Sequence, residues 1–233
     1  MKTIFVFALL AAAHGVAAQT PNTLTEAESQ AGFKLLFDGK TTQGWRNYQA
    51  DTLSPGWQVV DGALTRAGRA AGDIITRDQF TNFELLLEWR LSKDGPPGNS
   101  GIFYLVSEEP EAIYHGAPEM QILDNDRHGD GRSDLTSSGA NYALHSVSHT
   151  FTKPVGEWNS VRIVVHQGKV EHWFNGTLVV SYELGSADWK ERVARSKFVN
   201  WPAYGQARRG HIGLQDHGSF VAFRNVKIRE LTP

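Results

Sequence analysis

The stretch from residue 83 to residue 91 constrains the fold most, because its side chains alternate between apolar and polar. Every odd position is apolar, and the even positions are charged except at Leu86. Successive side chains of a β-strand point to opposite faces, so this period of two predicts a strand with one buried face. Such a face has to pack against a second layer.

Further strand patterns follow towards the C-terminus. Apolar positions alternate in 161–165, and a run over 170–174 meets Asn175-Gly176 before another run over 178–182. An Asn-Gly pair between two such runs is typical of a tight hairpin. A last alternating segment, 226–229, closes the chain. Many short strands separated by Gly-rich and Pro-rich turns predict an all-β fold, a two-sheet antiparallel sandwich of the jelly-roll type.

One or two short helices are expected beside the strands. Thr25 and Glu28 have the spacing of a capping box, for a helix that ends near Gly32. Ser186 is suited to cap a second helix that ends at Ala194. We therefore expect a leader with a short helix over 19–31 and one β-sandwich domain over 32–233, where no linker or repeat interrupts the chain.

Residues 1–18 predict an export signal. A basic residue precedes the apolar run 4–13, and small residues lead to a cleavage site near Ala18. We therefore expect a periplasmic or secreted protein. No later run reaches the roughly 20 apolar residues that a membrane span requires. The chain has no Cys, so the fold has to be stable without disulfides.

Charge and missing motifs exclude several function classes. The 23 basic and 25 acidic residues are spread without blocks, which argues against nucleic acid as a partner. No P-loop, GxGxxG, GxSxG or HExxH pattern occurs, so neither a nucleotide cofactor nor a serine hydrolase or zincin site is expected. The seven Trp residues fit either a core or stacking platforms for sugar rings.

The segment 210–218 presents an unusual polar face if it is a strand. Ile212 and Leu214 would then face the core, and His211, Gln215 and His217 would share the other face. Such a set suits a sugar or a metal ion, although polar residues are also ordinary on the outside of a sandwich.

The segment 118–124 can be interpreted in the same way. Glu119 and Gln121 would share the face opposite Met120 and Ile122. Partial burial raises the pKa of a carboxyl group towards neutrality, which makes Glu119 a candidate general base or metal ligand. A surface Glu on an edge strand is the simpler alternative.

The loop after this segment begins like a calcium loop at Asp124. His128 and Leu135 then occupy the fifth and twelfth positions, where oxygen ligands belong, so a polar rim loop is the better interpretation. His145 follows closely, and imidazole is both a proton carrier and a common metal ligand. Asn99, after a Pro/Gly turn, either presents an amide to a ligand or simply starts a strand.

Short motifs are distributed over 32–231. They include Phe37-Asp-Gly-Lys40, Gly44-Trp45, Gly56-Trp57, Asp61-Gly62, Phe83-Glu84, Glu88-Trp89, Asn99-Ser-Gly-Ile102, Pro118-Glu-Met-Gln-Ile-Leu-Asp-Asn125, Gly156-Glu-Trp-Asn159, His172-Trp-Phe-Asn-Gly176, Leu214-Gln-Asp-His-Gly218 and Phe223-Arg-Asn225. In order and density they resemble the 3-keto-disaccharide hydrolase family, also described as 3-keto-glucoside 1,2-lyases and 3-keto-2-hydroxyglucal hydratases. The resemblance implies an exported, concanavalin-like jelly roll that acts on glycosides already oxidised at C3.

The chemistry that this resemblance implies begins at C2 of the sugar. A ketone at C3 makes the C2 proton acidic, so a base can remove it, and the resulting enolate expels the group at C1 by β-elimination. Water then adds to the product, and the net reaction is hydrolysis. The route needs a base, an acid and a positive or hydrogen-bonding group beside the enolate oxygen, for which a divalent metal ion is economical.

We assign roles as a hypothesis. Glu119 or His145 is the base at C2, and His217 is the acid at C1. The groups expected to hold the substrate are Asn99, Gln121, His211 and Gln215. The expected metal ligands are Glu119, His145 and Asp124. Asp216 is expected on the core side with a partner such as Arg224.

Two other functions remain open from the sequence. A non-catalytic carbohydrate-binding module has the same sandwich shape and would tolerate Glu119→Gln. A glycosidase with two carboxyl groups is also compatible, because spacing in sequence does not give the separation of its acid and base. A protein-interaction domain ranks last, since no broad apolar patch is evident.

Overall fold

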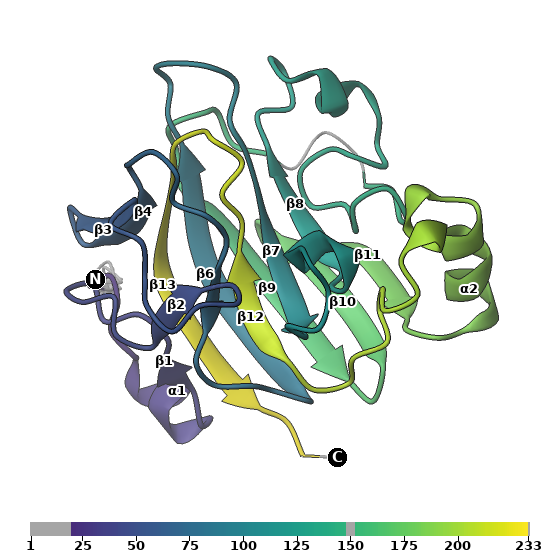
Figure 1. Ribbon diagram of the computed structural model, residues 1–233. Coiled ribbons are helices and arrows are strands. Elements are labelled where there is room, and N and C mark those ends of the chain that lie inside the picture. Colours follow the sequence, from purple (N-terminus) through teal and green to yellow (C-terminus); the bar gives the residue numbers. More distant parts are fainter. Residues whose placement is uncertain (1–19, 148–151, 233) are drawn as a thin grey trace, which may run out of the picture.

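The protein, described by a computed structural model over residues 20–147 and 152–232, consists of two antiparallel sheets packed face to face (Figure 1). The expected export signal, residues 1–18, lies outside the described residues. None of the helices in the described ranges is long and apolar enough to cross a membrane.

The larger sheet contains eight strands in the described part of the chain. Its order is β11 (Thr177–Glu183), β10 (Lys169–Phe174), β9 (Asn159–His166), β6 (Phe83–Leu91), β13 (Val221–Glu230), β4 (Ala63–Arg66) and β3 (Trp57–Val60), with β1 (Lys34–Leu35) paired to β13. The smaller sheet has the order β2 (Trp45–Asn47), β5 (Ile74–Thr76), β12 (His211–Leu214), β7 (Asn99–Val106) and β8 (Glu119–Leu123). The all-β sandwich expected from the sequence is confirmed.

Local signals in the sequence produce the elements they predict. Strand β6 has the bounds given by the alternating pattern. Asn175 and Gly176 both have positive φ, 47° and 83°, which a two-residue hairpin turn with primed geometry requires. The helix α1 (Glu26–Gln30) begins with the expected capping box, and Ser186 caps α2 (Ala187–Ala194).

The core lies between the two sheets. Strand β6 contributes its odd-numbered residues, and the smaller sheet contributes residues such as Ile102, Met120 and Leu214. Trp45, Trp57, Trp89 and Trp189 are all buried, so these four fill the core rather than serve as open sugar platforms. The face of the smaller sheet that points away from the core is called the outer face below.

A second, smaller apolar cluster covers one part of this outer face. It consists of Ile75, Phe103, Val106, Ile113 and Ala117, and the short 3-10 helix η1 (Ile113–His115) contributes to it. Gly213 lies beneath, where a Cβ would meet Ile113 Cδ1 at 2.7 Å. The outer face is therefore divided by this cluster, with polar side chains on either side of it.

Candidate active site

A hollow on the outer face of the smaller sheet collects five of the residues expected at the site. In the pairing of β7 with β8, Gly101 stands opposite Gln121 and Phe103 opposite Glu119. The backbone of Gln215 is fixed beside them, because its N–H donates to the Gly101 carbonyl at 3.0 Å. The hollow has a volume of about 360 Å³. The expected residues that line it are Asn99, Glu119, Gln121, Gln215 and His217.

Glu119 lies at the floor of the hollow. Only 7% of the residue is exposed, and its carboxyl group has no hydrogen-bond or ion-pair partner in the described part of the chain. Burial raises the pKa of Glu119 to about 8; the charge of Lys197 opposes this increase, while Asp73 and Asp130 add to it. A carboxyl group with this pKa exchanges its proton near neutral pH, as a general acid or base must.

The space for this carboxyl group exists because residue 101 is glycine. A Cβ at position 101 would lie 2.0 Å from Glu119 Oε1. The carboxyl group therefore rests directly on the backbone of β7, and any larger residue at 101 would displace it.

Three side-chain amides in the hollow have unsatisfied oxygens. Asn99 Oδ1, Gln121 Oε1 and Gln215 Oε1 are buried and have no hydrogen-bond partner among the described residues. Buried polar atoms are normally paired, and leaving one unpaired costs about 1–3 kcal/mol. Three such atoms around one hollow fit a ligand that carries several hydroxyl groups, as a sugar does.

Six lining residues were not expected from the sequence. They are Tyr114, His128, Asp130, Tyr142, Lys197 and Phe198. His128 and Asp130 come from the loop interpreted as a polar rim, where η2 (Gly129–Arg132) forms. Tyr142 is brought in because its N–H donates to the Glu119 carbonyl at 3.0 Å, and its hydroxyl donates to Asp130 Oδ2 at 3.4 Å. All six belong to loops or 3-10 helices, whose position an alternating pattern does not encode.

Lys197 and Phe198 reach the hollow from η4 (Lys197–Asn200), the 3-10 helix after α2. A column of stacked rings anchors this segment. Phe198 stacks on Tyr204 at 3.9 Å between centroids, and Trp189 stacks on Tyr204 at 5.7 Å. Tyr182 of β11 continues the column at 5.3 Å from Trp189. The 3-10 helix η4 is thus fixed to the sandwich by buried aromatic contacts.

His145 lies outside the hollow, which corrects the expectation that it joins Glu119. Asn141 pairs with Met120, whose side chain faces the core, and the amide of Asn141 contacts His145 Nδ1 at 2.9 Å. The imidazole stacks on Tyr182 at 4.6 Å and lies 3.4 Å from Asp188. Burial lowers the pKa of His145. The loop therefore places this residue on the core side of β8, so Glu119 remains as the candidate base.

His211 also lies outside the hollow, although it shares the outer face with Gln215 as expected. Its Nδ1 is 2.6 Å from the Thr76 carbonyl and its Nε2 is 2.9 Å from the Gln79 amide. Glu108, which is paired with Arg46, lies 3.6 Å from the ring. The apolar cluster around Phe103 separates this network from the hollow. His211 therefore does not join the other residues that were expected to hold the substrate.

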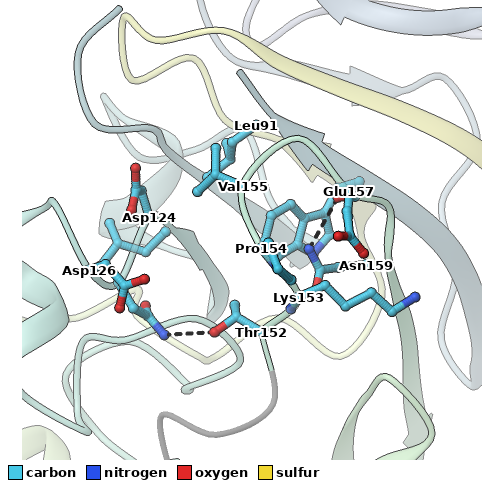
Figure 2. Close-up of a pocket in the computed structure, with 12 residues that line it drawn as sticks. Leu91, Asp124, Asp126, Thr152, Lys153, Pro154, Val155, Glu157 and Asn159 are labelled. Atoms are coloured by element: carbon cyan, nitrogen blue, oxygen red, sulfur yellow. Dashed lines mark hydrogen bonds between the residues drawn. The ribbon is translucent and has the colours of Figure 1, made fainter. Parts of the chain in front are cut away.

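Asp124, an expected metal ligand, lines a different pocket near the end of β8 (Figure 2). Figure 2 shows it beside Asp126, with Leu91, Pro154 and Val155 across the pocket. The Asp124 carboxylate accepts a hydrogen bond from Arg127 Nε at 2.5 Å. Its charge is thus balanced inside the protein.

The three expected metal ligands therefore do not converge. Glu119 is in the hollow, Asp124 is paired with Arg127, and His145 is stacked on the core side. Within residues 20–147 and 152–232, no three acidic or His side chains come together as a metal centre requires. The residues chosen from the sequence do not fit a metal site.

Asp216 has a partner other than the one expected. It accepts hydrogen bonds from Arg66 Nε at 2.6 Å and from the Gly72 N–H at 2.8 Å, whereas Arg224 binds Glu88. Burial alone would raise the pKa of Asp216, but the bonds from Gly218, Arg66 and Gly72 outweigh it and lower the pKa. Asp216 is thus a structural anion that fixes the backbone after β12.

The fold and the hollow together define a jelly-roll β-sandwich with a carboxyl group and several hydroxyl-binding amides on one face. Residues 32–229 match the family model described as a 3-keto-alpha-glucoside-1,2-lyase-like domain. The chain belongs to this family and is an enzyme.

Similar proteins agree with this assignment. A protein of Bacteroides thetaiotaomicron named 3-keto-disaccharide hydrolase is 37% identical over 231 residues, which cover 86% of this chain and 79% of the relative. A crystal structure from Parabacteroides distasonis, described as a candidate glycosyl hydrolase, is 37% identical with a TM-score of 0.83 and covers 91% of this chain and 100% of its own.

The fold alone extends to more distant proteins. A carbohydrate-binding module, CBM66 of Bacillus subtilis, is 12% identical with a TM-score of 0.51, over 80% of this chain and 96% of its own. Because this identity is low, the likeness shows a shared sandwich and carries no information about binding or catalysis.

Proposed function

We propose that the protein cleaves glycosides that carry a ketone at C3, by removal of the C2 proton, β-elimination at C1 and addition of water. The observation that carries this proposal is the carboxyl group of Glu119, buried and without a partner in the described chain, in a hollow with three unsatisfied amides. The family and the named relative from B. thetaiotaomicron support the substrate class.

Glu119 acts as the base at C2 in this proposal. With a pKa of about 8, its carboxylate is basic enough to accept a carbon-bound proton that the neighbouring ketone has acidified. Glu119 exchanges this proton with solvent and returns a proton to C2 when water adds to C1. Asn99, Gln121 and Gln215 hold the sugar hydroxyls, which orients C2 towards Glu119.

His217 is the proposed acid at C1. It lies just after β12, is exposed and lines the hollow. A proton donor at this rim can protonate the departing oxygen, and the released group then leaves directly to solvent. Catalysis follows if the C1 substituent points to the open side and C2 points to the floor.

We also propose export to the periplasm or the medium, on the basis of the N-terminal sequence pattern alone. The chain contains no Cys, so an oxidising compartment would not cross-link it through disulfides.

The test compares a 3-keto-glucoside with its unoxidised parent, with and without a chelator, by the rate at which the leaving group is released. The proposal expects release from the keto sugar alone, together with exchange of the C2 hydrogen in D₂O. Equal release from the parent would instead favour a conventional glycosidase, for which Glu119 and Asp130 are the carboxyl groups in the hollow. Binding of either sugar without release would contradict the proposal.

A further inference from the structure

We propose that Lys197 is a catalytic residue whose ammonium group stabilises the enolate oxygen at C3. This inference rests on the proposed function and deepens it, because elimination through an enolate needs a positive group that the expected metal ligands do not provide.

Lys197 is suitably placed, because it lines the hollow together with Glu119. No other Lys or Arg among the described residues lines it. Arg127, which is close in sequence to the rim residues, is paired with Asp124 in the other pocket. His128 also lines the hollow, and its Nδ1 accepts a hydrogen bond from the Asp130 N–H at 3.1 Å.

The ammonium group of Lys197 forms no ion pair within 4.0 Å in the described chain. It lies over the ring of Tyr142, 4.5 Å from the centroid, and 5.4 Å from the centroid of Phe198. Cation–π contacts orient a cation without cancelling its charge. Lys197 therefore keeps its full positive charge available for an anion in the hollow.

The backbone beneath Lys197 is fixed. Ser196 caps η4 by accepting a hydrogen bond from the Phe198 N–H at 3.1 Å, and Phe198 is buried against Tyr204. The cation–π contacts with Tyr142 and Phe198 hold the ammonium group beside the hollow, and the backbone that carries it is fixed as well. A preorganised charge is effective in catalysis because it needs little reorganisation when the transition state forms.

Glu119 takes the C2 hydrogen as a proton, and the electrons of the C2–H bond form the C2=C3 double bond while the ketone oxygen becomes an enolate. Lys197 neutralises this oxygen. The enolate electrons then form C1=C2 as the C3 carbonyl returns, the C1–O bond breaks, and His217 protonates the leaving oxygen. No oxidant or reductant is required.

Lys197 also affects Glu119. Its positive charge lowers the pKa of Glu119 relative to the value that burial alone would give. The charged and titratable groups that face Glu119 in and around the hollow are Asp73, Tyr114, His128, Asp130, Tyr142, Lys197 and His217. Removal of Lys197 should therefore shift the acidic limb of the pH profile, where activity increases as Glu119 ionises, to higher pH.

The experiment compares Lys197→Met, Lys197→Arg and the control Lys190→Met, which removes an exposed lysine of the neighbouring helix α2. We expect Lys197→Met to lower kcat on a 3-keto-glucoside by about 10²–10³-fold with a small change in KM, as removal of an oxyanion partner does. C2 exchange in D₂O should slow in parallel, and the pH profile should move to higher pH. Lys197→Arg should recover part of the rate.

Two results would overturn the inference. One is a Lys197→Met enzyme whose kcat and C2 exchange match those of the Lys190→Met control. The other is a loss of activity that follows a fall in Tm, with no shift of the pH profile and no recovery in Lys197→Arg, which would indicate a structural role. Absence of turnover and of C2 exchange in the wild-type enzyme would instead refute the proposed function itself.

Discussion

Glu84 and Glu119 lie on the faces of the larger and the smaller sheet that point away from the core, and 7% of each residue is exposed to solvent. Arg162 and Arg229 both bind Glu84, at 2.5 and 2.7 Å from their Nε atoms. Burial alone would raise the pKa of Glu84, but these bonds outweigh it and lower the pKa. Glu119 has no such partner, and burial raises its pKa to about 8. The neighbours of a buried carboxyl group, more than its exposure, therefore separate a structural role from a chemical one.

The same contrast divides the smaller sheet. Beyond the apolar cluster, His211 is in contact with Thr76 and Gln79, and Glu108 is paired with Arg46. In the hollow, by contrast, the oxygens of Asn99, Gln121 and Gln215 are unsatisfied among the described residues. Satisfied groups stabilise the fold, whereas these three oxygens reduce its stability unless a ligand in the hollow pairs with them.

The largest difference between the two glutamates should appear in activity. Glu119→Gln should lower kcat/KM on a 3-keto-glucoside by about 10²–10⁴-fold, because the base is lost. Glu84→Gln is the matched control and should change kcat/KM by less than about threefold, since it is on the other sheet. It should instead lower the free energy of unfolding by about 1–2 kcal/mol. Full activity of Glu119→Gln would show that Glu119 has no greater part in catalysis than Glu84.

The pH dependence of stability should also distinguish the wild-type protein from Glu119→Gln. The pKa of Glu119 rises from 4.5 to about 8 on folding, so between these values the native state binds more protons and stability falls as pH rises. In Glu119→Gln, stability should not decrease with rising pH for this reason. Denaturant unfolding at pH 5 and pH 9 should show the variant gaining on the order of 1–4 kcal/mol relative to wild type. An equal difference at both pH values would contradict the unpaired state of Glu119.

Gly101→Ala should displace the Glu119 carboxyl group, because the new Cβ would lie 2.0 Å from Oε1. A shift of this size should lower kcat/KM by about 10–100-fold. Gly129→Ala is the control in a nearby loop, where an added Cβ meets nothing within 4 Å. Steady-state kinetics of both variants measure the effect, and equal rates would show that the position of the carboxyl group is not critical.

Gln215→Met should raise KM by about 5–10-fold, since one hydrogen bond to a sugar hydroxyl is lost. The same change removes a buried unsatisfied amide, so Tm should stay constant or increase. Gln58→Met, at an exposed position of the larger sheet, should alter neither quantity. If Gln215→Met lowers Tm and leaves KM unchanged, the amide has a structural role.

Only a small effect on activity is expected for His145→Gln. His145 stacks on Tyr182 on the core side of β8, so kcat/KM should change by less than about fivefold while the free energy of unfolding falls by about 1–2 kcal/mol. Kinetics and denaturant unfolding of one preparation measure both. A loss of activity as large as that of Glu119→Gln would restore His145 as a candidate base.

The strand residues of the site were predictable from the sequence. A period of two determines which side chains share a face, so Glu119 and Gln121 could be placed together, as could Gln215 and His211. The same pattern does not say which residues along a face are close. His211 and Gln215 are four residues apart, roughly 13 Å along a strand, and an apolar cluster lies between them.

The loop residues were not predictable in this way. Tyr142 and His145 belong to one loop, yet Tyr142 reaches the hollow and His145 the core side, because Asn141 pairs with Met120. Lys197 follows α2 by only a few residues, and its position depends on the stacking of Phe198 against Tyr204. These contacts are long-range and leave no periodic signal.

The most direct measurement is an NMR titration of the Glu119 carboxyl carbon in protein labelled with ¹³C-glutamate, with Glu119→Gln used to assign the signal. We predict that the Glu119 carboxyl group titrates near pH 8. The pKa of Glu84, by contrast, should lie below the usual value for glutamate. A midpoint for Glu119 at or below the ordinary value for glutamate would contradict this prediction, because the carboxyl group would then have a partner or solvent in the hollow.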